Sequence, residues 1–249
     1  MIALKSPNLN SSIAGVTIQN LVFSYPQQPP TLSNISFTIN SGERVALLGR
    51  TGAGKSTLME NLMGLKQPQS GEIWIQGIRL ESATISQVRR LVGFSFQNPD
   101  DQLFMPTILE DVTFGPLNYG MSIADARDRA FQLLADFGLT DYIHRSAHEL
   151  SSGQKRLAAL AAILALEPTI LILDEPTNGL DPWWRRYLAQ VLSQLPIAVL
   201  LIASHDLNWI GKTTQRALVL AAGKIQVDRS TQELLEDSLT LENYGLPRD

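Results

Sequence analysis

The amino-acid sequence predicts an α/β fold built on a mainly parallel core sheet. Strand-like and helix-like segments alternate along the chain, which is the order typical of a parallel sheet covered by helices. Two continuous apolar runs, at residues 170–173 and 197–202, are typical of strands buried on both faces. The chain has 249 residues, of which 44% are hydrophobic and 18% are charged. This length and composition fit one large packed domain, or one domain with a sizeable subdomain.

The predicted strands are short apolar runs bounded by turn residues. The first begins at Val16, and a proline-rich turn follows it at residues 26–30. The run at residues 70–77 alternates around Ile73 and Ile75, which indicates a half-buried strand bounded by glycines. The remaining predicted strands lie at residues 32–39, 43–48, 170–173, 197–202, 218–220 and 225–227.

Helical spacing of apolar residues predicts three helices. They cover residues 55–65, residues 122–138, and a segment from near Ser151 to just before Pro168. The helices between about 98 and 166 would form an inserted helical subdomain.

The helix at residues 122–138 has the clearest signals. Ser122 followed by Asp125 indicates a capping box in which aspartate replaces the usual glutamate or glutamine. One apolar stripe then runs along the helix, formed by Ala126, Ala130, Leu133, Leu134 and Phe137.

Composition excludes several classes of protein. The absence of cysteine excludes disulfides, thiolate metal sites, iron–sulfur clusters and cysteine nucleophiles. The 20 Lys and Arg residues against 24 Asp and Glu give a net charge of −4, which argues against nucleic acid as a partner bound through bulk charge. No run approaches the roughly 18 apolar residues of a membrane-spanning helix. Residues 1–14 are polar, so we expect a flexible N-terminus without a signal peptide, and a cytosolic chain that reaches a membrane through a partner.

Residues 49–56 read G-R-T-G-A-G-K-S and match the phosphate-loop pattern G-x-x-x-x-G-K-[ST]. The glycines allow backbone N–H groups to surround phosphate oxygens, and the helix that follows points its positive end at the same anion. We expect Lys55 to contact the β- and γ-phosphates, Ser56 to offer its hydroxyl to Mg²⁺, and Thr57 to reach the α-phosphate. A chance glycine-rich turn is the alternative, but the predicted strand before the motif and the helix after it are the context that a phosphate loop requires. The predicted phosphate-binding residues are Gly49, Arg50, Thr51, Gly52, Ala53, Gly54, Lys55, Ser56 and Thr57.

Two acidic residues, Asp174 and Glu175, end the apolar run at 170–173. A parallel strand delivers its last residues to the carboxyl edge of the sheet, where the ligand crevice of an α/β fold lies. We expect Asp174 to hold Mg²⁺, directly or through water. Glu175 would then polarise a water molecule for in-line attack on the γ-phosphate. Solvated acids at an ordinary strand end are the alternative, which the upstream phosphate loop disfavours.

With these motifs the chain resembles the ATP-binding cassette (ABC) ATPases, which are P-loop NTPases, over nearly its whole length. The segment Leu150-Ser151-Ser152-Gly153-Gln154 is similar to the family signature LSGGQ, and Gln97 follows an apolar segment in the manner of the family's Q-loop glutamine. Gly179-Leu180-Asp181 resembles the family's D-loop, and Ser204-His205-Asp206 resembles the segment that carries its switch histidine. Tyr25 is placed like the aromatic residue that stacks on adenine in the family.

The resemblance implies one domain at residues 15–249, with an N-terminal antiparallel β part and the inserted helical subdomain at about 98–166. It implies ATP and Mg²⁺ as cofactors, bound between two cassettes arranged head to tail, in a homodimer or with a paralogous ATPase. The implied catalytic residues are Glu175, His205 and Gln97, and the implied Mg²⁺ ligands are Ser56, Gln97 and Asp174. Beyond the phosphate loop, the implied nucleotide contacts are Tyr25, Ser151, Gly153, Gln154 and Asp181.

Ser152 departs from the family signature, because a glycine usually stands there. Its side chain adds a β-carbon and a hydroxyl near the place where phosphate should bind. Gly153 remains, so we expect a competent site whose efficiency Ser152 could alter.

The stretch at residues 93–116 is similar to the energy-coupling-factor (ECF) ATPases, and most to those that power cobalt and nickel uptake. This implies a peripheral protein on the cytoplasmic face of the cell membrane, with a transmembrane scaffold subunit and a substrate-capturing membrane subunit as partners. Vitamin-importing members are similar here, so the cargo stays open. We expect Leu103, Phe104 and Met105 to be exposed and to receive a partner helix; the alternative is that they fill the core of the helical subdomain.

Two other classes of protein fit the sequence less well. A soluble, non-transport ABC ATPase acting on nucleic acid or ribosomes usually carries two cassettes or a long coiled-coil insertion, and this chain has one cassette with a compact interval from Gln97 to Ser151. A Rossmann-type dinucleotide enzyme is excluded because the glycines lead into Lys55-Ser56 and the Asp174-Glu175 pair lies outside one βαβ unit.

Overall fold

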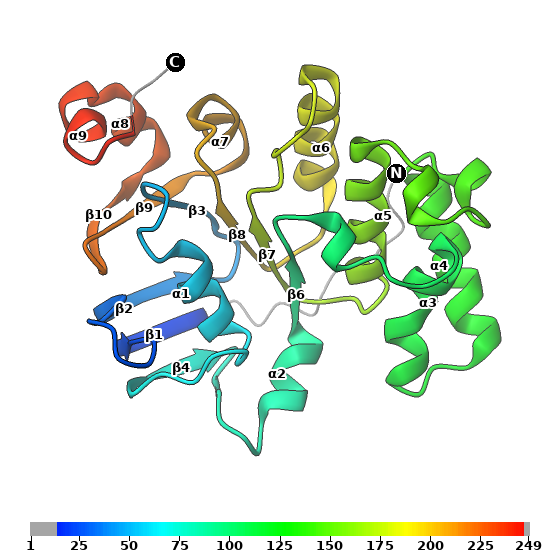
Figure 1. The fold of residues 1–249 in the computed structure, drawn as a ribbon, viewed down its shortest axis with the longest axis horizontal. Coiled ribbons are helices and arrows are strands. Elements are labelled where there is room, and N and C mark those ends of the chain that lie inside the picture. The colour runs from blue at the N-terminus through cyan, green and yellow to red at the C-terminus, as the bar shows by residue number, and fades with distance from the viewer. Residues whose placement is uncertain (1–13, 247–249) are drawn as a thin grey trace.

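The computed structural model describes residues 14–246 and consists of two sheets and a group of helices (Figure 1). Ten strands and nine α-helices lie within this range. The flexible N-terminus expected at residues 1–14 lies outside the described residues except for Ala14, which begins β1 (Ala14–Phe23). The predicted α/β fold with a mainly parallel core sheet is confirmed.

The core sheet has six strands in the order β10-β9-β3-β8-β7-β6. All neighbouring pairs are parallel except the edge pair of β9 and β10, which is antiparallel. The strands are β3 (Arg44–Leu48), β6 (Val92–Ser95), β7 (Ile170–Asp174), β8 (Val199–Ala203), β9 (Arg216–Ala221) and β10 (Lys224–Ser230). Every residue of β7 and β8 is buried, as their continuous apolar sequences predicted.

A second, antiparallel sheet has the strand order β2-β1-β4-β5. Its other strands are β2 (Leu32–Asn40), β4 (Ser70–Ile75) and β5 (Ile78–Arg79). The predicted strand at 70–77 stops at Ile75 because Gln76 and Gly77 take positive φ and turn the chain back into β5.

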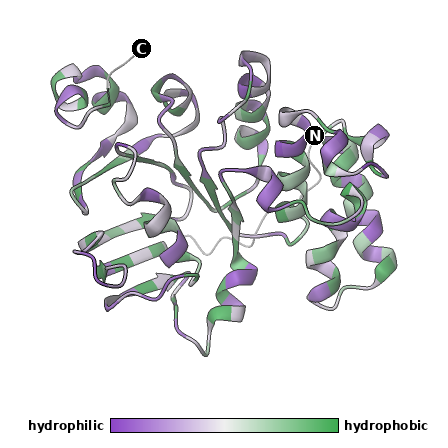
Figure 2. Ribbon diagram, in the orientation of Figure 1, coloured by the Kyte–Doolittle hydropathy of each residue, from purple (hydrophilic) through white to green (hydrophobic). Residues whose placement is uncertain are grey.

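Two apolar clusters cover opposite faces of the core sheet. On one face Val45, Leu47, Ile170 and Ile172 pack with the antiparallel sheet and with α1 (Lys55–Leu62). The residues that alternate with these along the same strands point to the other face, where they pack against helices. Figure 2 shows the resulting concentration of hydrophobic residues in the strands of the core sheet.

The helical group beside β6 contains α3 (Ile108–Asn118), α4 (Ile123–Asp136) and α5 (Ser152–Leu164), which pack against one another (Figure 1). Three short 3₁₀ turns, Pro99–Asp101, Thr140–Tyr142 and Ala147–Glu149, belong to the same region. The remaining helices are α2 (Ile85–Leu91), α6 (Pro182–Gln194), α7 (Leu207–Thr213), α8 (Thr231–Glu236) and α9 (Ser238–Asn243). Within the described residues no helix is long and apolar enough to cross a membrane.

Helix ends differ from the predictions by a few residues: α4 stops at Asp136 rather than at residue 138, and α5 stops at Leu164, short of Pro168. The first helix ends at Leu62 rather than at residue 65, because Gly64 takes a positive φ. Ser122 caps α4 as predicted, but the capping box is incomplete. The Asp125 carboxylate accepts the Ser122 hydroxyl at 2.6 Å instead of the backbone N–H, since aspartate is one carbon shorter than glutamate.

The prediction that Leu103 is exposed is wrong. Its side chain is 6% exposed and belongs to the core cluster of the helical group. Phe104 points the other way and is 63% exposed, while Met105 is partly buried. One of the three apolar residues therefore fills the core.

Arg216 of β9 joins the two sheets. Its guanidinium makes two bonds of 2.7 Å to the Asp228 carboxylate, contacts Glu43, and donates to the Thr38 carbonyl of β2 at 2.8 Å. The carboxylates of Asp228 and Glu43 raise the pKa of Arg216 above its usual value.

We expect Arg216→Met to lower the free energy of unfolding by about 1–3 kcal/mol, because it removes several charge-assisted hydrogen bonds at the sheet junction. Urea denaturation measures the change. Arg79→Met is the matched control, since it breaks the exposed Arg79–Glu72 pair and should cost less than about 0.5 kcal/mol. Equal losses in the two variants would contradict the bridging role.

Candidate active site

The phosphate loop joins β3 to α1 at the carboxyl edge of the core sheet. Gly54 precedes the helix with a φ of 104°, a conformation that favours glycine. A β-carbon at Gly49 would overlap the Leu220 carbonyl of the neighbouring strand. The Lys55 ammonium lies across the loop, donating to the carbonyls of Gly49 at 2.7 Å and Arg50 at 3.3 Å. The loop therefore has the compact form that presents backbone N–H groups to an anion.

A cleft of about 560 Å³ opens beside this loop. It brings together most of the residues that the sequence indicated, from five separate segments of the chain. Those that line it are Tyr25, Thr51, Gly52, Gly54, Lys55, Ser56, Thr57, Gln97, Asp174, Glu175 and His205. Sequence reasoning missed Gln28, Thr31 and Asn178; the last follows the Asp174-Glu175 pair closely enough to have been suspected.

Asp174 is the last residue of β7 and is buried at the base of the cleft. Burial raises the pKa of its carboxyl group, and a hydrogen bond from Ser56 opposes that rise. Burial also lowers the pKa of Lys55, against the opposing charges of Glu175 and Asp174. The partly buried cleft thus holds one positive and two acidic side chains. The positive charge can balance the charge of a polyphosphate, and the carboxylates can balance that of a divalent cation.

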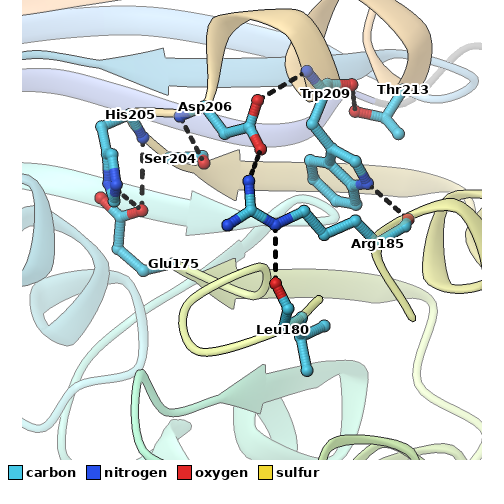
Figure 3. Close-up of polar contacts among 8 residues, drawn as sticks. All are labelled: Glu175, Leu180, Arg185, Ser204, His205, Asp206, Trp209 and Thr213. Carbon is cyan, nitrogen blue, oxygen red and sulfur yellow. Dashed lines mark hydrogen bonds and ion pairs between the residues drawn. The ribbon is translucent and has the colours of Figure 1, made fainter. Parts of the chain in front are cut away.

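Glu175 and His205 are in direct contact. The imidazole Nδ1 lies 2.8 Å from Glu175 Oε2, and the His205 backbone N–H donates to the same oxygen at 3.3 Å (Figure 3). Glu175 has a positive φ of 45°, which turns it out of the β7 direction. Because an ionised carboxylate only accepts hydrogen bonds, this contact keeps the proton on Nδ1 and leaves Nε2 for a further partner. The His205 side chain is 66% exposed, so it is not a core histidine.

Tyr25 lies at the rim of the cleft. Its hydroxyl is 3.1 Å from Thr57 Oγ1, and the Lys66 ammonium lies over its ring, 4.9 Å from the centroid. Phe23 packs against it edge-on at 5.1 Å. The sequence singled out Tyr25 and gave no signal for Lys66.

The signature-like segment does not line this cleft. Ser151 and Gln154 form a complete capping box at the start of α5. The Ser152 hydroxyl donates to the Gly179 carbonyl at 3.1 Å, which gives the departure from the LSGGQ pattern a local partner. A β-carbon on Gly153 would overlap the indole of Trp184, so packing requires glycine there.

Two further predicted residues have structural partners. The Asp181 carboxylate caps α6 by accepting the N–H groups of Trp183 and Trp184, both at 2.9 Å. The Gln97 carbonyl accepts from the Arg156 guanidinium at 2.7 Å, and Arg156 also donates to the Phe96 carbonyl at 2.9 Å.

Arg156, which sequence reasoning missed, is a buried cation of α5. Burial lowers its pKa to about 10, so the guanidinium stays charged at neutral pH. It joins the helical group to the loop after β6 that carries Gln97.

The donor set of the cleft fits a nucleoside triphosphate with Mg²⁺. Backbone N–H groups of the loop and Lys55 suit phosphate oxygens, and the hydrogen-bonded oxygens of Ser56 and Asp174 suit a hard cation that keeps several waters. Among the described residues no group of three or more His, Cys, Asp or Glu side chains is placed to hold a metal ion.

Comparisons with known proteins agree with this geometry. The family model described as "ABC transporter" matches residues 32–178. The energy-coupling factor transporter ATP-binding protein EcfA of Methanothermobacter thermautotrophicus is 39% identical over 235 residues, covering 93% of this chain and 76% of EcfA. EcfA of Methanosphaera stadtmanae is 38% identical, covering 92% and 84%.

Solved structures give the same result. CbiO1 from Clostridium perfringens, described as part of the ABC transporter complex cbiONQ, superposes with a TM-score of 0.82 at 30% identity, covering 94% of this chain and 96% of its own. A dimeric ATP-binding cassette in a post-hydrolysis state bound to ADP and Pi gives a TM-score of 0.77 at 28% identity, covering 87% and 98%. The chain therefore belongs to the ABC transporter family and is an ATP-hydrolysing cassette of the energy-coupling-factor type.

Proposed function

We propose that the chain is the ATP-binding and ATP-hydrolysing subunit of an ECF-type membrane importer. The observation that carries this is the contact of Glu175 with His205 in the cleft of the phosphate loop, because it puts a base beside the place where the γ-phosphate would end. The cargo we propose is cobalt or nickel ions, because the stretch at residues 93–116 most resembles the ECF ATPases that power uptake of these metals. A vitamin is the second candidate, because vitamin-importing members are similar in the same stretch.

The proposed chemistry is in-line hydrolysis of the γ-phosphate. Lys55 and the N–H groups of the phosphate loop hold the phosphates, and Ser56, Gln97 and Asp174 hold Mg²⁺, which supplies charge neutralisation when bound. Glu175 takes the proton of the attacking water. His205 lines the cleft and orients Glu175 through Nδ1, which leaves Nε2 available for the γ-phosphate.

The proposed active form is a head-to-tail dimer of two identical chains, with a paralogous ATPase as the alternative partner. Ser151, Gly153, Gln154 and Asp181 lie outside the cleft of their own chain, which supports a role toward the nucleotide of a second chain. The similar cassette bound to ADP and Pi is itself dimeric, which supports a dimer.

The proposed docking surface for the membrane scaffold is the exposed aromatic pair Phe104 and Phe114. The two rings meet edge to face at 5.0 Å. Buried Asp111 holds the loop beneath them, because one of its carboxylate oxygens accepts the N–H groups of Phe104 and Met105, both at 2.9 Å. Exposed aromatic side chains on a rigid loop are typical of protein interfaces. Docking there would keep the chain peripheral, on the cytoplasmic face of the cell membrane beside the scaffold and substrate-capturing subunits.

We expect Glu175→Gln to reduce ATP hydrolysis by roughly 10²–10⁴, because the amide keeps the shape of glutamate but not its basicity. Nucleotide should still bind, and sedimentation with ATP should show a dimer that ADP does not support. Lys55→Ala serves as the contrast, since it should weaken binding itself. Full activity of Glu175→Gln would contradict the general-base assignment, and a strict monomer with ATP would point to a paralogous partner.

Tyr25→Ala should raise the dissociation constant for ATP by roughly tenfold or more, because stacking of a base on an aromatic ring contributes about 1–3 kcal/mol. Tyr25→Phe keeps the ring, loses only the contact with Thr57, and should be nearly silent. Calorimetric titration of both variants measures the difference. Equal losses of ATP affinity in Tyr25→Ala and Tyr25→Phe would assign the effect to the hydroxyl.

Phe104→Asp should abolish assembly with the membrane subunits while ATP binding and intrinsic hydrolysis stay unchanged. The side chain is largely exposed, so the thermal midpoint should move by less than a few degrees. Leu239→Asp, on α9 and 74% exposed, is the matched control and should assemble normally. Co-purification measures assembly, and transport assays measure function. A stable Phe104→Asp variant that still transports would show that the scaffold docks elsewhere.

A further inference from the structure

Arg185 in the first turns of α6 connects two loops that the proposed chemistry uses. Its Nε donates to the Leu180 carbonyl at 2.9 Å, and one terminal nitrogen donates to Asp206 Oδ2 at 2.9 Å (Figure 3). Leu180 belongs to the loop that begins at Gly179, and Asp206 directly follows His205. One guanidinium thus joins the D-loop-like segment to the turn that carries His205.

The turn at Asp206 has further fixed contacts. The Asp206 N–H donates to the buried Ser204 hydroxyl at 3.1 Å, and Asp206 Oδ1 caps α7 by accepting the Trp209 N–H at 2.9 Å. The Trp209 indole N–H donates back to the Arg185 carbonyl at 2.8 Å. Arg185 and Asp206 are therefore linked by side chain and backbone in a closed ring between α6 and α7.

His205 is joined to this ring through its peptide bond to Asp206. Both hydrogen bonds drawn for His205 in Figure 3 go to Glu175 Oε2, and the side chain is otherwise largely in solvent. At the other end, the Gly179 carbonyl beside Leu180 accepts the Ser152 hydroxyl of the signature-like segment. A continuous series of contacts runs from Ser152 through Arg185 to the Glu175–His205 pair.

We propose that Arg185 is a positioning residue that couples the segment Gly179–Asp181 to the Glu175–His205 pair, so that the pair is aligned for hydrolysis only when that segment is in place. This rests on the proposed catalytic roles of Glu175 and His205. Arginine suits the task because its fork presents donors in two directions at once. Lysine can keep the ion pair with Asp206, but its single nitrogen lacks the second, rigidly spaced donor that the guanidinium directs at the Leu180 carbonyl.

The contact has little to contribute to stability. The Arg185 side chain is 44% exposed, and half-exposed ion pairs add little to the free energy of folding. A loss of turnover on removing it would therefore report alignment rather than unfolding.

The test compares Arg185→Gln, Arg185→Lys, Asp206→Asn and the Arg185→Gln/Asp206→Asn double variant of the full chain. Asp206→Asn keeps the oxygen that caps α7 and removes the charge. We expect kcat for ATP to fall about tenfold in Arg185→Gln with KM within about twofold, a smaller fall in Arg185→Lys, and a double variant no worse than the single ones. Arg229→Gln is the matched control: it breaks a 2.9 Å pair with Asp237, neither residue lines the cleft, and the change should leave kcat unchanged.

The outcomes separate this proposal from the proposed function. Unchanged kcat in Arg185→Gln beside an inactive Glu175→Gln would overturn the positioning role alone. Additive losses in the double variant, or a fall in thermal midpoint that exceeds that of Arg229→Gln, would overturn it as well. Full activity of Glu175→Gln would overturn the proposed site, and this role with it.

Discussion

The register of three parallel strands determines the rest of the site. Leu47 of β3 pairs with Ala203 of β8, and Ala203 pairs in turn with Asp174 of β7. This row lies within one residue of the end of each strand, so the phosphate loop, Glu175 and His205 leave the sheet at neighbouring positions. A slip of one residue in any strand would move its loop by about 3.3 Å and turn its side chains to the other face. The buried apolar faces of these strands prevent such a slip.

Much of this arrangement could be predicted from the sequence, because its signals are local. The continuous apolar runs of β7 and β8, the glycine pattern before Lys55 and the order of the motifs all lie within short segments. The sequence also indicated Tyr25, Gln97 and His205 as neighbours, through a resemblance rather than through any spacing.

The rest depends on contacts between distant segments. Nothing near Gly153 shows that Trp184 packs where its β-carbon would be, and nothing near Gln97 shows that Arg156 holds its carbonyl. Leu103 was expected to be exposed because a short apolar run has no periodicity that separates its inner residues from its outer ones. The helices α6 and α7 were missed although Asp181-Pro182 and Asp206 are ordinary helix-start signals. In α6 the apolar residues Trp184, Leu188, Val191 and Leu192 also recur at helical spacing, so the sequence carried a periodic signal for this helix as well.

Arg156 has a mechanical consequence for the helical group. Its guanidinium is buried between α5 and the loop of Gln97, with Nε lacking a hydrogen-bond partner. If the loop moved without α5, the charge would lose its two carbonyl partners inside the protein, which is far more costly than breaking a surface contact. We therefore expect the loop and the helix to move together, so that a displacement of Gln97 is passed on to α5 as a whole.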